Sequence, residues 1–305
     1  MPYLGSLAFL ILHFMLGPSS RPKVKNLIFS YQSRMPLYGR FVFLRMMKLS
    51  ALVLLLICDH KTWAKSSQER IVGGVELPIH LSPWLASISV HGNYSCSSAL
   101  ITSQWLVTAG HCVNYPDSYV VRAGSVSADE GGQQRDVARI ILHPEFKIRT
   151  LENDIALLKI RKSFILGGNV QLVKLPLPGL NILPRNLLLA GWGTVSANDS
   201  DSAPELRGTL VEAIDQRHCR HLYSHLNRRI TDNMLCAAAP GRDHCFGDSG
   251  APLVHRGSSY GIVSFAHGCA DPHFPGVYTR LANYVNWIFS VLKTDNKRNL
   301  LSDKK

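Results

Sequence analysis

Short apolar segments separated by turn residues most constrain what this chain can fold into. They are rich in Val, Ile, Leu and Ser, and a proline-rich stretch, Leu175–Pro184, divides them into two groups. The segments are Trp84–Val90, Ser98–Thr102, Trp105–Thr108, Tyr119–Ala123, Val137–Leu142 and Ile155–Ile160, then Leu187–Gly191, Thr209–Ile214, Pro252–His255, Tyr260–Phe265 and Gly276–Arg280. Segments of strand length with frequent turns predict an all-β fold of two small barrels, each with about six strands.

The last apolar pattern is helical. Val285, Ile288 and Leu292 recur at helical spacing and predict a terminal helix over Tyr284–Leu292. We expect residues 294–305, which are polar, to form a frayed tail.

Charge is concentrated outside the predicted barrels. The chain carries a net charge of +12, but residues 1–70 hold ten basic and two acidic side chains, and the segment from Lys293 onward holds five basic and two acidic ones. The predicted barrels are therefore nearly neutral, which argues against a nucleic-acid-binding surface.

The cysteines indicate an oxidising compartment. Cys58 lies in an apolar run, whereas six others fall among the predicted strands without the spacing of a metal site: Cys96, Cys112, Cys219, Cys236, Cys245 and Cys269. They predict disulfides, although sequence alone leaves every pairing open. Asn93 and Asn198 begin glycosylation sequons, which fit the same compartment.

The amino-terminal region contains a pattern typical of secretion. Residues 47–64 combine a charged start at Met47-Lys48, an apolar core at Leu49–Ile57 and a small-residue cleavage site ending at Ala64. We expect translation to begin at Met46 or Met47, with residues 1–46 a spurious or non-conserved extension of the gene model; the alternative is a retained, lipid-associated amino terminus. Residues 65–70 would remain as a short propeptide without cysteine.

Three motifs carry the chemistry. Their order along the chain is Thr108-Ala109-Gly110-His111-Cys112, Asn153-Asp154-Ile155-Ala156-Leu157-Leu158 and His244-Cys245-Phe246-Gly247-Asp248-Ser249-Gly250-Ala251-Pro252. This order of His, Asp and Ser resembles the chymotrypsin-type, trypsin-like serine proteases of the S1 family, in particular invertebrate trypsin-like members, over residues 71–293. The resemblance implies two six-stranded antiparallel Greek-key barrels, with the active site in the cleft between them and a carboxy-terminal helix.

A serine needs help to act as a nucleophile, because its hydroxyl is protonated at neutral pH. His111 is the candidate base and Asp154 the candidate group that orients it, with Ser249 as the nucleophile. The backbone N–H groups of Gly247 and Ser249 would form the oxyanion hole. Taken singly, these residues could instead be a packing histidine, a turn aspartate and a loop serine.

The resemblance also implies a substrate preference. Asp243 stands where trypsin-like members place a carboxylate that pairs with arginine or lysine of the substrate. Ser264, Ala266 and Gly276 would line the same pocket. Three departures from the family pattern leave a narrowed, non-tryptic pocket as an alternative: His244, Ala251 and the Phe265-Ala266 pair. A non-catalytic homologue acting as a binding module is the other alternative.

Activation and partners follow from the same resemblance. Cleavage at Arg70–Ile71 would free an α-ammonium that pairs with Asp248, linking activity to proteolysis. The implied disulfides are Cys96–Cys112, Cys219–Cys236 and Cys245–Cys269. We expect a secreted monomer that meets polypeptide substrates, an activating trypsin-like protease and protein protease inhibitors, but neither nucleic acid nor a membrane.

No cofactor or metal is expected. The segment Gly124–Gln134, which matches a calcium loop in vertebrate trypsins, begins with Ser125 where a glutamate ligand would stand. The histidines His218, His221 and His225 lack the spacing of a zinc motif.

Overall fold

The computed structural model describes residues 74–115, 117–194, 203–240, 244–245, 247–269 and 271–302, with side chains as far as residue 297. The predicted signal peptide and propeptide, Arg70, Ile71, Asn198 and Asp243 lie outside the described residues.

The first barrel is closed and antiparallel. Its strands follow the order β2-β3-β4-β7-β6-β5 around the barrel. Their bounds are Leu85–Val90 (β2), Asn93–Leu100 (β3), Trp105–Thr108 (β4), Tyr119–Ala123 (β5), Gln133–Leu142 (β6) and Ala156–Ile160 (β7). His91 and Gly92, which join β2 to β3, both have positive φ, as a two-residue turn matched to the strand twist requires.

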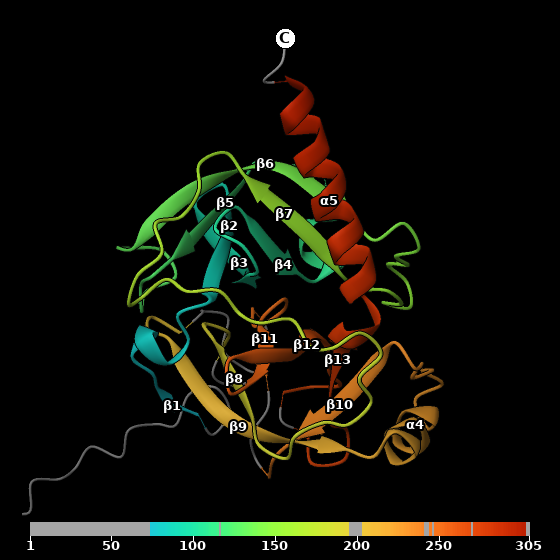
Figure 1. Ribbon diagram of the computed structural model, residues 1–305. Helices are drawn as coiled ribbons and strands as arrows, with labels where there is room; N and C mark the ends of the chain where they lie inside the picture. Colours follow the sequence, from blue (N-terminus) through green and yellow to red (C-terminus); the bar gives the residue numbers. More distant parts are fainter. Residues whose placement is uncertain are drawn as a thin grey trace, which may run out of the picture. The chain divides into compact units, whose positions relative to one another are not determined.

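The second barrel contains β9-β10-β13-β12-β11-β8, and pairing of β8 with β9 closes it. Its strands are Leu187–Gly191 (β8), Arg207–Ile214 (β9), Met234–Ala238 (β10), Pro252–His255 (β11), Ser258–Phe265 (β12) and Gly276–Arg280 (β13). A two-residue strand, Val75–Glu76 (β1), adds to the edge of β9. Figure 1 shows this barrel below the first one. The predicted fold class is confirmed.

Apolar packing joins the two barrels directly. One buried cluster contains Val107 and Ile155 of the first barrel together with Val254 and Ile262 of the second and Tyr284 near the terminal helix. Each barrel also has a cluster of its own. The shared cluster includes Ala109 and Ile155, which lie close to His111 and Asp154 in the sequence, so it holds these segments against the second barrel.

Within the described part of the chain, two α-helices lie outside the barrels. Helix α4 (Gln216–Ser224) is capped at its amino terminus by Asp215, whose side chain accepts hydrogen bonds from the backbone N–H groups of Arg217 and His218. Helix α5 (Val285–Ser302) runs along the first barrel in Figure 1. None of the helices among the described residues has the length and apolar character that a membrane crossing needs. Single 3-10 turns occupy Ile79–Leu81 (η2), Gly110–Val113 (η3) and Leu281–Asn283 (η4).

The expectation of a frayed tail was wrong for residues 294–302. Helix α5 continues to Ser302, because the buried Asp295 pairs with Arg139 at 3.0 Å and with Lys159 at 2.6 Å on the first barrel. These ion pairs fasten a polar segment that apolar periodicity could not place.

Three disulfides connect Cys96 to Cys112, Cys219 to Cys236 and Cys245 to Cys269. These are the pairs that the family resemblance implied. The first lies in barrel one, the second fastens α4 to β10, and the third braces the loop before Ser249.

Candidate active site

His111 lies on a short turn at the end of a buried strand. Strand β4 leads into η3, and the Cys96–Cys112 bridge holds the neighbouring residue. A Cβ atom at Gly110 would lie 3.3 Å from Asp154 Oδ1, so glycine leaves room for the carboxylate. The His111 side chain keeps 22 % of its surface exposed, enough to reach a substrate.

Asp154 is buried and points at His111. Its Oδ1 accepts from the His111 backbone N–H, its Oδ2 lies 2.8 Å from His111 Nδ1, and the Ser264 hydroxyl donates to the same Oδ2 at 2.6 Å. An ionised carboxylate can only accept, so Nδ1 carries the proton and Nε2 keeps its lone pair. The site thus contains a histidine oriented to accept a proton.

Backbone geometry before Asp154 explains the Asn-Asp pair. Asn153 has a φ of 55°, in the left-handed region that asparagine tolerates better than most residues. Its side chain donates to the Glu145 carbonyl and accepts from Asn233 and from the Tyr284 hydroxyl. The resulting turn is held rigidly in the orientation that directs Asp154 toward His111.

Ser249 follows a tight turn and is joined to the first barrel by its backbone. The Ser97 N–H donates to the Ser249 carbonyl at 2.8 Å, and the next residue, Gly250, donates to Val263. Gly250 has a φ of 82°, and a Cβ there would collide with the Ser97 carbonyl and the Thr108 hydroxyl. Among the described residues no hydrogen bond links the His111 ring to the Ser249 hydroxyl; such contacts often tighten only when substrate binds.

A tyrosine that sequence reasoning missed holds Gly247. The Tyr94 hydroxyl donates to the Gly247 carbonyl at 2.6 Å and lies 2.9 Å from Ser97 Oγ. Burial, and secondly the charge of Asp248, raise the pKa of Tyr94, so its hydroxyl stays protonated. Gly247 itself has a φ of 94°, which explains why glycine stands there.

Asp248 lies in a fully buried site lined by glycines. Its carboxylate accepts from the backbone N–H groups of Gly193 and Cys245 at 2.9 and 3.0 Å. A Cβ at Gly191 or at Gly193 would collide with this carboxylate. The two glycines of the Gly191-Trp192-Gly193 segment are the sequence signal that could have predicted this arrangement.

The proposed pocket residues are described only in part. Gly276 begins β13 and is buried, Ser264 contacts Asp154, and Ala266 is half-buried. Of the departures from the family pattern, His244 is buried against the Tyr278 ring at 5.2 Å and Ala251 is fully buried. Asn93 is exposed at the start of β3, where a glycan could attach.

Metal-binding chemistry has one candidate in the described part of the chain. The only group of three or more His, Cys, Asp or Glu side chains close enough for an ion is Cys96, His111 and Cys112. Both cysteine sulfurs are in the disulfide, so they are not thiolate ligands.

Comparison with known proteins agrees with this geometry. The family model Trypsin matches residues 71–288. Trypsin of Squalus acanthias is 37% identical over 234 residues, covering 75% of this chain and 99% of that protein, and trypsin 5G1 of Aedes aegypti is 36% identical over 233 residues, covering 75% and 87%. Mouse neuropsin, a serine protease expressed in the limbic system of the brain, has a similar structure with a TM-score of 0.66 at 32% identity, covering 72% of this chain and 98% of that one. The chain therefore belongs to the trypsin family of chymotrypsin-type serine proteases and is a serine endopeptidase.

Proposed function

We propose that this trypsin-like protease is secreted as a zymogen, is activated by cleavage at Arg70–Ile71, and cleaves polypeptides after arginine or lysine. The observation that carries the catalytic part is the hydrogen-bonded set formed by His111, Asp154 and Ser264. Ser249 is separately held against the first barrel by the Ser97 N–H. The preference for basic residues rests on Asp243 in the sequence.

The proposed reaction has two halves. Ser249 Oγ attacks the scissile carbonyl while His111 Nε2 takes its proton, and Asp154 stabilises the imidazolium that forms. The Gly247 and Ser249 N–H groups bind the oxyanion. His111 then returns the proton to the leaving amine, which leaves an acyl-enzyme on Ser249; water attacks this ester by the same route and regenerates the serine.

Activation would act through Asp248. The described residues surround its carboxylate with two backbone N–H donors, and a new ammonium at Ile71 would add the opposite charge. A buried ion pair is tolerable only when both partners are present and hydrogen-bonded. Cutting Arg70–Ile71 would thereby order the loop that contains Gly247 and Ser249.

Secretion and partners are proposed on the disulfides and the leader pattern. Three disulfides persist in an oxidising compartment such as the extracellular space. There we expect a monomer that meets polypeptide substrates, an activating trypsin-like protease and protein protease inhibitors.

A peptide library tests the proposal. After the chain has been cut at Arg70–Ile71, the enzyme should cleave mainly after arginine and lysine, and Ser249→Ala should abolish turnover while the thermal transition remains. Asp243→Ser should lose the preference for arginine over leucine esters. Turnover by Ser249→Ala at the wild-type level would refute the mechanism, and an unchanged preference in Asp243→Ser would refute the pocket assignment.

A further inference from the structure

An arginine covers an aromatic ring beside the active site. The Arg228 guanidinium lies 3.6 Å from the centroid of the Phe265 ring. Phe265 directly follows Ser264, the residue that donates to Asp154. Tyr223 packs edge-on against Phe265 at 5.9 Å and is itself held by a hydrogen bond to the Pro275 carbonyl. The stacked pair is therefore built on a fixed support, one residue away from the catalytic contact.

The charge of Arg228 has no acidic partner in the described part of the chain. Its side chain is half-buried, and no carboxylate of the described residues lies within ion-pair distance. Burial lowers the pKa of Arg228 from its ordinary value, which for arginine is so high that the group stays charged at neutral pH. Stacking satisfies one face of the guanidinium and leaves the N–H donors at its edge available. This edge has the geometry that binds a carboxylate with two hydrogen bonds.

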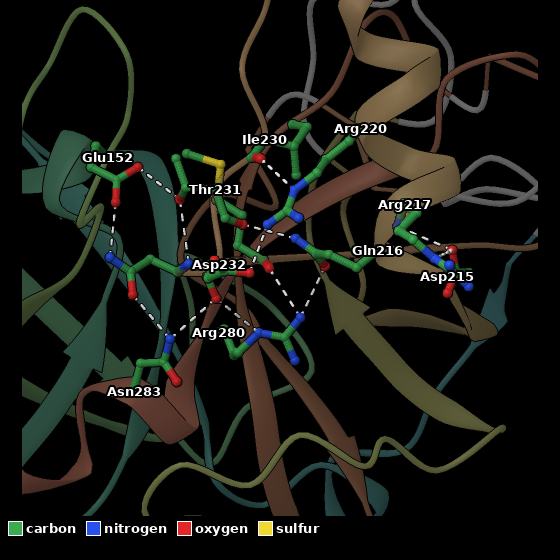
Figure 2. Close-up of polar contacts among 12 residues, drawn as sticks. Glu152, Asp215, Gln216, Arg217, Arg220, Ile230, Thr231, Asp232, Arg280 and Asn283 are labelled. Carbon is green, nitrogen blue, oxygen red and sulfur yellow. Dashed lines mark hydrogen bonds and ion pairs between the residues drawn. The ribbon is translucent and has the colours of Figure 1, made fainter.

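Arg228 also lines a hollow of about 1050 Å³ that is rich in basic side chains. Its walls contain the further cations Lys147, Arg220 and Arg229 and the acids Glu152 and Asp232. Figure 2 shows that Glu152 accepts from Thr231 and that Asp232 pairs with Arg220, at 2.6 Å. Glu152 also accepts from Asn233, but both of its donors are neutral and leave its charge in place. Lys147 and Arg229 have no such pairing among the described residues. With Asp232 paired to Arg220, the three remaining cations of the lining outweigh the single charge of Glu152, so the net charge of the hollow is positive.

We propose that Arg228, held on Phe265 at the edge of this hollow, binds an acidic side chain of the substrate on the amino-terminal side of the cleaved bond. The inference rests on the proposed function, in which Ser264 and Ala266 line the pocket for the residue before that bond. A polypeptide leading into the pocket then passes Phe265. The stacked arginine covers this aromatic surface. It therefore disfavours apolar side chains of the substrate there and offers a cation to acidic ones.

Paired peptides test the subsite. Each peptide has arginine before the cleaved bond and either Glu or Gln at the second, third or fourth position before it, with alanine at the other two. At one of these positions the wild-type enzyme should prefer Glu by about fivefold in kcat/KM, which is the effect of one partly exposed charge pair. The preference should shrink between about 20 mM and about 300 mM salt.

Variants identify the residue responsible. Arg228→Gln should lose the preference for Glu, and because it uncovers Phe265 it should gain kcat/KM on peptides with leucine at that position. The matched control is Arg217→Gln on α4, whose side chain is 92% exposed and does not line the hollow; this variant should keep the preference for Glu.

Two results would overturn the inference: equal kcat/KM for Glu and Gln peptides at all three positions, or a preference for Glu that survives in Arg228→Gln. Failure of the proposed function looks different, because then the peptide with arginine and no acid is not cleaved. In that case the comparison is made by binding: Ser249→Ala should bind the Glu peptide more tightly than the Gln peptide, and equal binding also overturns the inference.

Discussion

Replacing Tyr94 with phenylalanine removes one hydroxyl from behind the proposed oxyanion hole. The change leaves the Gly247 carbonyl without the Tyr94 hydroxyl as its donor. It also leaves the fully buried Ser97 hydroxyl without its hydrogen-bond partner, the same Tyr94 hydroxyl 2.9 Å away. Each unmade buried hydrogen bond costs about 1–3 kcal/mol, and Tyr94 is only part-buried, so we expect a total loss of about 2–3 kcal/mol of unfolding free energy. A loss of that size corresponds to a fall in Tm of about 4–12 °C for a domain of this size.

The effect on catalysis is separable from the effect on stability. Removing an oxyanion donor costs about 10²–10³ in kcat, and a donor that loses only its support should cost less, about tenfold. KM should change little, because the oxyanion does not exist in the bound ground state. The raised pKa of Tyr94 keeps its hydroxyl protonated, so the ratio of wild-type to variant kcat should be constant between about pH 6 and pH 10.

The assay combines steady-state kinetics on an arginine ester with thermal unfolding. Tyr119→Phe is the matched control, because it also removes a hydrogen bond to a backbone carbonyl, that of Tyr115, within the first barrel. It should lower Tm without lowering kcat. If Tyr94→Phe keeps kcat within twofold of wild type, the carbonyl of Gly247 does not need this support and the reasoning is refuted.

Three further predictions concern stability and the Asp248 site. Asp295→Ala should lower the unfolding free energy by about 2–3 kcal/mol in urea titrations, since it deletes a buried carboxylate paired with two cations; a change below about 0.5 kcal/mol would show that α5 is held by apolar contacts alone. Gly193→Ala should lower kcat at least tenfold, because its methyl group would lie about 2.5 Å from the Asp248 carboxyl carbon, and a fully active variant would contradict the tight packing. Burial lowers the pKa of His143, so the folded state binds this proton less readily than the unfolded one; stability should be complete above about pH 6.5 and fall below it. His143→Asn should flatten that decline in unfolding measurements between about pH 5 and pH 7, and an unchanged slope would show that other groups cause it.

The barrels could be predicted because many strands contain short apolar segments that are largely buried, such as Ala156–Ile160 and Leu187–Gly191. Strand β10 was missed, since Met234–Ala238 contains alanine and cysteine and has no strong β-forming pattern. It forms because β9 and β13 pair with it on both sides. Strand β6 begins four residues before its predicted start, because exposed polar side chains alternate with half-buried ones along Gln133–Asp136.

The candidate site was likewise predicted only in part from the sequence. His111, Asp154 and Ser249 lie in motifs that can be recognised locally, and their order along the chain supplied the rest. Tyr94 contacts Gly247 and Arg228 contacts Phe265, both of which are far away in sequence. No local sequence pattern predicts such contacts. The roles of these missed residues therefore depend on the tertiary fold and could not be predicted from any single segment of the sequence.

The Cys96–Cys112 bridge has a consequence for how the two reacting groups move. Cys112 adjoins His111, and Cys96 adjoins Ser97, whose N–H holds the Ser249 carbonyl. The base and the nucleophile, although carried by different barrels, are thus joined by one covalent link and one hydrogen bond. When thermal motion displaces one barrel against the other, this connection should move His111 and Ser249 in the same direction. The distance between these two residues should therefore fluctuate less than the distance between the barrels. Reducing this single bridge should uncouple the two motions and weaken turnover before the fold is lost.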